Sequence, residues 1–442
     1  MNHPRPAAPD AMPSADILGV TRLPTIPAVI KRNTLLLATA QAFVGVGNQM
    51  VPTLGAIMVT QLLGSPALAG LATSILGGCR FLVAYPVGYA ADTYGRRAGL
   101  LAGLLLSLVG AITVGRSLMQ RSFLAFLGGL VLFGLGVGAG QQLRLAAADL
   151  YPPSRRAEGL GYVLMGSLVG ALGGPLLISA AQTTAPALGL EPLALAWLLI
   201  PLIVLPSLGL VWLIHPDPRE IAANLSAYYP GQAVTPGAGL EDGAPLSMGR
   251  LLRKYPVRVA LSTSFALQGT MAMVMAMTSL ALAHHGYALP AVSLAVAIHV
   301  MGMYGLSLPL GHLTDRLGRR AVMLSGVVIA GAGSGLVSLS SAYGVITAGT
   351  FLVGLGWSCM NVAVVALLAD TTHPRERGRA IGVNDTVSGV AAIILPLVAG
   401  PLVALFGLAS LAVVSVCLLT MPFVLLLRLH ETSPGCYMVQ RH

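Results

Sequence analysis

Charged side chains are scarce in this sequence. Asp, Glu, Lys and Arg make up only 9% of its 442 residues, whereas 55% are hydrophobic and the mean hydropathy is +0.81. Soluble proteins carry roughly 25% charged residues, which cover the surface that faces water. So little charge excludes a water-soluble globule and predicts that most of the chain faces lipid.

Cysteine pairs and enzyme signatures are also missing. The four cysteines (Cys79, Cys359, Cys417 and Cys436) show no Cys-x-x-Cys or Cys/His spacing, so we expect neither a metal site nor a cofactor. The sequence has no Gly-Lys-Ser/Thr phosphate loop, no His-Glu-x-x-His motif and no credible nucleophile triad. These absences argue against an enzyme. Without an ATPase module, any transport must draw on a gradient.

Long apolar runs dominate what is present. They are continuous and each is close to the roughly 20 residues that cross a bilayer as a helix, which predicts an all-α membrane protein and disfavours a β-barrel. The twelve predicted spans are 34–62, 66–91, 98–117, 122–149, 157–183, 190–214, 257–283, 288–313, 320–340, 343–370, 377–403 and 406–429. Residues 1–32 lack an apolar core and are interpreted as a cytoplasmic tail, not a signal peptide.

The positive charges predict the orientation. With the N-terminus inside, 21 of the 25 Lys and Arg residues lie on the cytoplasmic side, Arg116 and Arg121 lie outside, and Arg80 and Arg144 lie within spans. This asymmetry follows the positive-inside rule and predicts cytoplasmic N- and C-termini in the plasma (inner) membrane. The same topology explains the net charge of +10, so we expect no nucleic-acid partner.

A charged turn occurs twice, 223 positions apart. Both copies read Gly-x-x-x-Asp-x-x-Gly-Arg-Arg: Gly88, Asp92, Gly95, Arg96 and Arg97, then Gly311, Asp315, Gly318, Arg319 and Arg320. Other matching pairs are 221 positions apart: Asp149 and Asp370, Pro153 and Pro374, Arg156 and Arg377, Gly161 and Gly382, Pro175 and Pro396. This internal repeat predicts two six-span halves, 33–214 and 257–430, joined by a cytoplasmic loop 215–256 and followed by a tail 431–442.

The repeated turn, the twelve spans and the half-chain repeat together resemble the major facilitator superfamily. The resemblance covers roughly residues 33–430. It implies a fold of two pseudo-symmetric helical halves with a substrate path between them, and a secondary transporter that moves a small organic solute by alternating access. We expect it to act as a monomer.

Each position of the turn has an expected role. Gly88 and Gly311 would let helices approach closely. Gly95 and Gly318 suit a reversal that needs a positive φ. Asp92 would accept hydrogen bonds from arginines or from a helix N-terminus, as would Asp315.

The resemblance adds a latch between the halves. In the family this loop stabilises one state and meets span 11, which implies that Asp92 pairs near Arg96 and with the start of span 11, where Arg377 and Arg379 lie. An alternative is that the arginines of the turn only anchor the cytoplasmic side.

Span 5 is similar to the glycine signature of the superfamily's antiporters. Gly161, Gly170, Gly174 and Pro175 stand in the places of that signature, although Ile178-Ser179 replaces its final glycine pair. The similarity implies export coupled to inward proton flow and close packing of this span on span 8. Ordinary packing of small residues is the alternative. The span-4 arginine of drug exporters is absent, because Leu130 stands in its place.

Ionisable residues inside spans are candidates for function, because each costs at least about 2.5–3.5 kcal/mol at the helix centre. Asp385 is the leading proton carrier and His299 the second, since its reference pKa lies near the physiological range. A latch role for Asp385 and a neutral, hydrogen-bonded His299 remain open. Arg80 could pair with Asp385 or with a backbone carbonyl, and Arg144 with Asp149 or Asp92.

Uncharged polar residues in the spans that line the cavity of this family are expected substrate contacts. They are Asn48, Gln49, Gln141, Gln268 and Asn361. Each could instead form an interhelical hydrogen bond. We predict a proton-coupled exporter of small organic molecules, with a proton-coupled importer of an organic acid as the alternative, or a scaffold that does not transport. The intramembrane arginines favour neutral or anionic substrates.

Overall fold

The computed structural model describes residues 26–140, 142–152, 155–229, 248–372 and 374–429, and these residues form helices without any strand. Eleven helical stretches are long and apolar enough to cross a bilayer, and a bent helix pair brings the count to twelve. The predicted all-α architecture with twelve spans is therefore confirmed.

The chain order of the helices follows the two predicted halves. The first half contains α1 (Ala28–Asn48), α2 (Met50–Leu63), η1 (Pro66–Leu68), α3 (Leu71–Tyr94), α4 (Arg96–Met119), α5 (Phe123–Gly140), α6 (Gln142–Asp149), α7 (Arg156–Thr184), η3 (Pro186–Leu188) and α8 (Pro192–Trp212). Two short helices, α9 (Pro218–Ala223) and α10 (Leu225–Tyr228), follow. The second half contains α11 (Met248–Arg253), α12 (Tyr255–His284), α13 (Leu289–Tyr304), α14 (Ser307–Leu317), α15 (Arg319–Leu339), α16 (Tyr343–Thr371), α17 (Pro374–Phe406) and α18 (Ala409–Leu427).

The outer surface of the bundle is apolar. Leu124, Leu176 and Leu405 expose 81%, 73% and 76% of their area, and many other large apolar side chains are exposed with them. A water-soluble monomer rarely shows apolar patches of such extent. This surface is the lipid-facing one that the composition predicted.

Two spans are interrupted near the middle of the bundle. α1 ends at Asn48 and α2 begins at Met50, because Pro52 has no N–H to donate to the carbonyl of Asn48. The break leaves the amide side chains of Asn48 and Gln49 at mid-bundle. In span 8, α13 ends at Tyr304 and the chain bends by 44° before the rest of the span.

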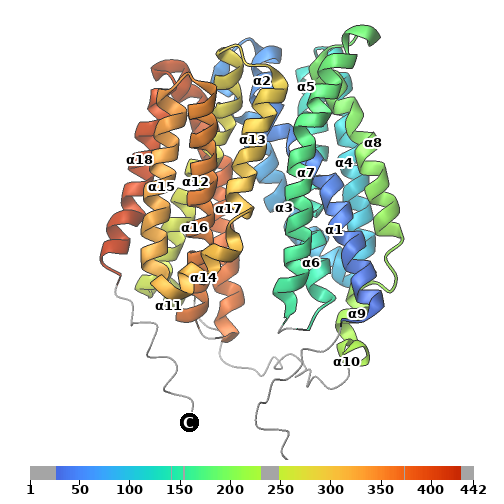
Figure 1. The fold of residues 1–442 in the computed structure, drawn as a ribbon, viewed down its shortest axis with the longest axis vertical. Helices are drawn as coiled ribbons and strands as arrows, with labels where there is room; N and C mark the ends of the chain where they lie inside the picture. Colours follow the sequence, from blue (N-terminus) through green and yellow to red (C-terminus); the bar gives the residue numbers. More distant parts are fainter. Residues whose placement is uncertain (1–25, 141, 153–154, 230–247, 373, 430–442) are drawn as a thin grey trace, which may run out of the picture.

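The halves stand side by side, and α9, α10 and α11 lie at one end of the bundle, hereafter the linker end (Figure 1). Close contacts between the halves lie toward the opposite end. A Cβ on Gly70 would overlap the carbonyl oxygen of Pro396 in α17, and one on Gly400 would overlap that of Ala67 in η1. Backbone thus packs directly on backbone where the two halves meet.

The repeated turns lie at the linker end. Gly95 and Gly318 have φ of 97° and 91°, so the expected positive φ is confirmed at both glycines. The expected close approach at Gly311 is wrong, because a Cβ there would meet nothing within 4 Å. The surroundings of Gly88 lie outside the described part of the structure.

Candidate functional site

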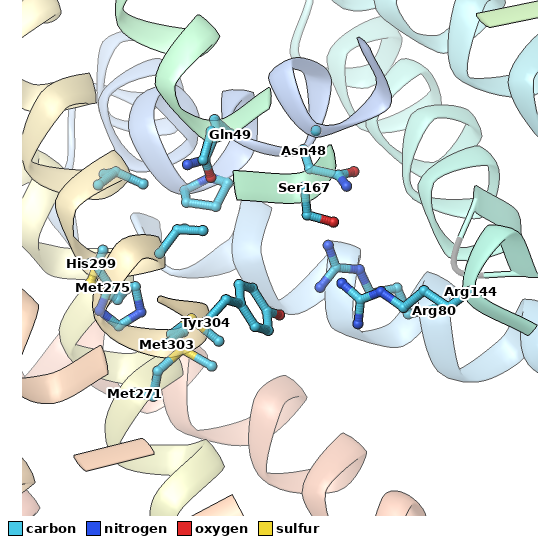
Figure 2. Close-up of a pocket in the computed structure, with 15 residues that line it drawn as sticks. Asn48, Gln49, Arg80, Arg144, Ser167, Met271, Met275, His299, Met303 and Tyr304 are labelled. Atoms are coloured by element: carbon cyan, nitrogen blue, oxygen red, sulfur yellow. The ribbon is translucent and has the colours of Figure 1, made fainter. Parts of the chain in front are cut away.

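A cavity of about 190 Å³ lies between the two halves. Ligand pockets for drug-sized molecules run to roughly 300–1,000 Å³, so this cavity suits a small organic molecule. Helices α1 to α3, α6 and α7 line it from the first half, and α12 and α13 from the second (Figure 2). Its lining residues are Gly45, Asn48, Gln49, Pro52, Arg80, Arg144, Ser167, Ala171, Met271, Met275, Val296, His299, Val300, Met303 and Tyr304.

One wall of the cavity is cationic. The side chains of Arg80 and Arg144 lie next to each other, and the hydroxyl end of Tyr304 points toward them (Figure 2). The Arg144 guanidinium carbon is 5.6 Å from the centre of the Tyr304 ring, within the range of a cation–π contact. None of the fifteen lining residues carries a carboxylate. The wall therefore favours an anionic group on the bound molecule.

Of the partners expected for these arginines, the two whose side chains are described, Asp149 and Asp385, do not pair with them. Asp149 pairs with Arg96 instead of Arg144, and the side chain of Asp92 lies outside the described residues. Asp385 does not line the cavity, and no ion pair or hydrogen bond to Arg80 occurs among the residues that the structure describes. The Nε atom of Arg144 is buried and has no partner among the residues whose placement is described. Both charges are thus available to a substrate.

The facing wall is apolar and soft. Met271, Met275 and Met303 line it together with Val296 and Val300. Methionine adapts to irregular shapes and its sulfur makes favourable contacts with aromatic rings. The sequence analysis did not consider this wall, although the i, i+4 methionines within "MAMVMAM" in span 7 were a usable signal.

His299 belongs to the cavity and is also tied to α16. Its ring is 3% exposed and Nδ1 lies 2.8 Å from the backbone oxygen of Thr350. Nε2 is buried and has no hydrogen-bond partner in the described ranges of the chain. The hydrogen-bonded histidine that the sequence analysis left open is observed, with one nitrogen still unpaired.

The expected polar contacts divide into two groups. Asn48 and Gln49 line the cavity, and each has one buried amide atom without a partner. Gln268 lines an adjoining pocket of about 110 Å³ and accepts a 3.2 Å hydrogen bond from Trp357 Nε1. Asn361 lines neither pocket, and Gln141 lies outside the described residues. Ser167 of α7 lines the cavity and was missed.

Asp385 lies at the linker end of the contact between α3 and α17. Along α17, Pro396 abuts Gly70, Ala392 abuts Gly77 and Gly389 abuts Phe81. These contacts are spaced four and three residues apart, which marks one helix face, and Asp385 continues that face one turn further. Its side chain is exposed there.

Both repeated turns hold the same ion pair within their own half. Arg96 Nε is 2.8 Å from Asp149 Oδ2, and Arg319 Nε is 2.8 Å from Asp370 Oδ2. Each pair joins the start of one span (α4 or α15) to the end of the next (α6 or α16). Asp315 adds a contact of 3.3 Å to Arg319. The side chains of Arg156 and Arg377, predicted for the same gate, lie outside the described part of the chain.

The linker adds a contact that the sequence analysis missed. The Asp217 carboxylate accepts hydrogen bonds from the backbone N–H groups of Arg96 (3.1 Å) and Arg97 (3.0 Å), so it caps α4 in the manner expected of Asp92. The Arg97 guanidinium stacks on Trp212, 4.5 Å from its ring centre. Tyr229 donates to the Leu150 carbonyl, and burial raises the pKa of Tyr229 to about 12.

The glycine row of α7 packs mainly on α1. A Cβ on Gly170 would overlap the Ala42 carbonyl oxygen, whereas Gly161 has open space. Only Gly174 comes near span 8, where its Cβ would lie 3.4 Å from Ser293 Oγ. The expectation that the whole row faces span 8 is therefore wrong for Gly161 and Gly170. The helix continues through Pro175.

Comparisons with known proteins agree with this architecture. The sequence model of the Major Facilitator Superfamily matches residues 37–277 and 259–435. The uncharacterised MFS-type transporter YdeG of Bacillus subtilis is 30% identical over 371 residues, which are 81% of this chain and 83% of that protein. The riboflavin transporter RfnT of Brucella anthropi is 26% identical and covers 81% of this chain and 85% of its own.

A solved structure shares the fold. The crystal structure of a bacterial homolog of the human lysosomal transporter Spinster, in an inward-facing and occupied conformation, superposes with a TM-score of 0.67 at 14% identity, over 89% of this chain and 95% of that one. The two matches to the family model span most of the helical region. This chain therefore belongs to the major facilitator superfamily and is a multi-pass membrane transporter, not an enzyme.

Proposed function

We propose that this protein is a proton-coupled exporter of small organic anions. The observation that carries the proposal is the cavity wall where Arg80 and Arg144 lie together without a lining carboxylate. Hydrogen bonds to charged groups are worth roughly 1.5–3 kcal/mol each, so two guanidinium groups without a lining carboxylate favour an anion. The methionine wall opposite them suits an apolar body on the same molecule.

Export agrees with the charge of such a substrate. With the linker end in the cytoplasm, as the positive-inside rule predicts, the cell interior is the negative side. The membrane potential makes the exit of an anion favourable by about 2.3 kcal/mol per charge for every 100 mV, and it makes the entry of a proton favourable by the same amount. The antiporter-like glycines of α7 support the same direction.

Asp385 is the proposed proton carrier. It is exposed at the linker end of the contact between α3 and α17. Closure of that end would bring α3 against Asp385. Its access to water would then change with each transport cycle, and burial favours the protonated form of a carboxyl group. His299 is less suited to carry the proton because its side chain is buried, and burial disfavours the charged imidazolium.

Proteoliposomes with an internal pH-sensitive dye test the proposal. Aromatic sulfonates serve as substrates because they stay charged and do not carry protons through the lipid. We expect a naphthalenesulfonate gradient to drive proton movement in the opposite direction, with no response to tetraphenylphosphonium or sugars. Riboflavin, the molecule in the name of one relative, completes the screen.

Two matched variants assign the proton. Asp385→Asn should abolish the proton flux, whereas Glu220→Gln, on the exposed surface of α9, should leave it unchanged. If Asp385→Asn keeps the proton flux, Asp385 does not carry the proton, and the latch role is the interpretation that stays. Protons that move with the anion would establish the alternative, a proton-coupled importer of an organic acid, which the arginine wall also favours.

A further inference from the structure

The hydrogen bond to Thr350 determines the tautomer of His299. A backbone carbonyl can only accept, so Nδ1 carries the proton and donates it to Thr350 across 2.8 Å. In the neutral ring, Nε2 then has a lone pair and acts as an acceptor. The ring of His299 is therefore held in one orientation with one defined role for its free nitrogen.

The free nitrogen is turned toward the cavity side of the ring. The two nitrogens of an imidazole point in nearly opposite directions, and Nδ1 points to α16, which contributes no residue to the cavity lining. Gly354 of α16 makes the tie possible, since a Cβ there would overlap the backbone oxygen of His299 and lie 3.1 Å from its Nδ1.

Within the described part of the chain, no group pairs with Nε2 of His299. It is buried without a hydrogen-bond partner, and the lining residues on its own helix face are Val296 and Met303, which offer no donor. A buried acceptor left unpaired is unfavourable, so a ligand that brings a donor gains affinity.

His299 and the arginines lie at different ends of the cavity. Figure 2 shows His299 beside Met275 on one side, Arg80 and Arg144 on the other, and Tyr304 between them. A molecule that bridges the cavity thus meets cations at one end, thioethers and an aromatic ring along its length, and a lone pair at the far end.

We propose that His299 Nε2 accepts a hydrogen bond from the substrate, so that the preferred substrates are flat apolar acids with an N–H or O–H group at the end remote from the anionic group. This inference rests on the proposed function, because the arginines must hold the anionic end. His299 is then a residue that determines specificity, and it does so by recognising one polar atom.

Two matched probes test the inference. Indole-3-acetate carries a ring N–H, and benzothiophene-3-acetate has nearly the same shape with sulfur in its place. We expect the purified wild-type protein to bind the indole acid about tenfold more tightly in titration calorimetry, because a site that pairs a donor rejects the analogue without it. His299→Phe should bind both acids equally, near the wild-type affinity for benzothiophene-3-acetate.

Further variants separate the inference from the proposed function. His299→Gln, which can present an acceptor oxygen, should keep part of the preference for indole, and it replaces His299→Phe if that variant does not fold. Arg80→Gln should weaken both acids alike. Equal wild-type affinities, or a preference that survives in His299→Phe, would overturn only the inference. If neither acid binds to the wild type, the anion-transport proposal falls, and the inference with it.

Discussion

The two halves share one repeated pattern but give the cavity opposite characters. Arg80 and Met303 both stand eight residues before the first glycine of their turn, and both line the cavity. Arg144 and Val365 both stand five residues before the aspartate of their ion pair, but only Arg144 lines the cavity. The two halves thus have equivalent positions, but different residue types occupy them. The cavity therefore has a cationic wall from the first half and an apolar wall from the second.

The turns, by contrast, kept their chemistry. The bonds from Arg96 to Asp149 and from Arg319 to Asp370 have the same length and join equivalent helices. The ion pair supports the scaffold of each half, so both halves need it, whereas a cavity that binds one asymmetric molecule does not need two equal walls.

The largest expected effect comes from a substitution at one of the two matched cavity positions, Arg80 and Met303. Arg80→Gln removes a charged contact worth roughly 1.5–3 kcal/mol, so affinity for naphthalenesulfonate should fall at least about tenfold. Met303→Leu at the equivalent position conserves volume and should change affinity less than about threefold. Titration calorimetry measures both, and equal effects would contradict the division into two walls.

The contact between the halves can be broken at its tightest point. Gly70→Ala should force η1 and α3 away from α17, because the new Cβ would overlap the Pro396 carbonyl. Gly78→Ala, inside α3 where the added Cβ would meet nothing within 4 Å, is the control. Spin labels at Leu68 and Leu405, both exposed, should move apart only in Gly70→Ala. An unchanged distance would show that this end does not depend on backbone contact.

The two ion pairs should differ in strength although their lengths agree. Asp149 is 23% exposed and Asp370 is 47% exposed, so solvent screens the second pair more. Asp149→Asn should cost roughly 1–2 kcal/mol of unfolding free energy and Asp370→Asn less than about 1 kcal/mol. Thermal unfolding in detergent measures both variants, and a larger loss for Asp370→Asn would reverse this ranking.

The smallest expected effect concerns the cap of α4. Asp217→Ala removes the acceptor of three backbone N–H groups, those of Arg96 and Arg97 in α4 and that of Arg219 in α9, and should cost about 1 kcal/mol, as is typical of N-cap residues. The stacking of Arg97 on Trp212, which joins α4 to α8, does not involve Asp217 and should remain. The start of α15 has no side-chain cap among the described residues. Asp315→Ala therefore removes no cap and should not cause the loss of stability expected for Asp217→Ala. Thermal unfolding of Asp217→Ala and Asp315→Ala makes the comparison.

Much of the fold and part of the site could be predicted from the residues alone. Span number, the two halves and the positive φ of Gly95 and Gly318 follow from hydropathy, repetition and glycine sterics, which are local properties. Polar groups within a membrane span are energetically costly, so they are candidates for function. This criterion identified five residues that line the cavity: Arg80, Arg144, His299, Asn48 and Gln49. The methionine wall was not predicted, because the sequence does not show which apolar residues of a span face the cavity and which face lipid.

The sequence by itself determined that this chain spans a membrane twelve times as two repeated halves, because burial of apolar segments and the reach of one helix across a bilayer require no knowledge of neighbours. Only the tertiary structure decided that Asp149 pairs with Arg96, that Asp217 caps α4, and that His299 turns one nitrogen to Thr350 and leaves the other free. Those outcomes depend on which groups far apart in the chain come within about 3 Å of each other, and hydrogen bonds and ion pairs act only over such distances.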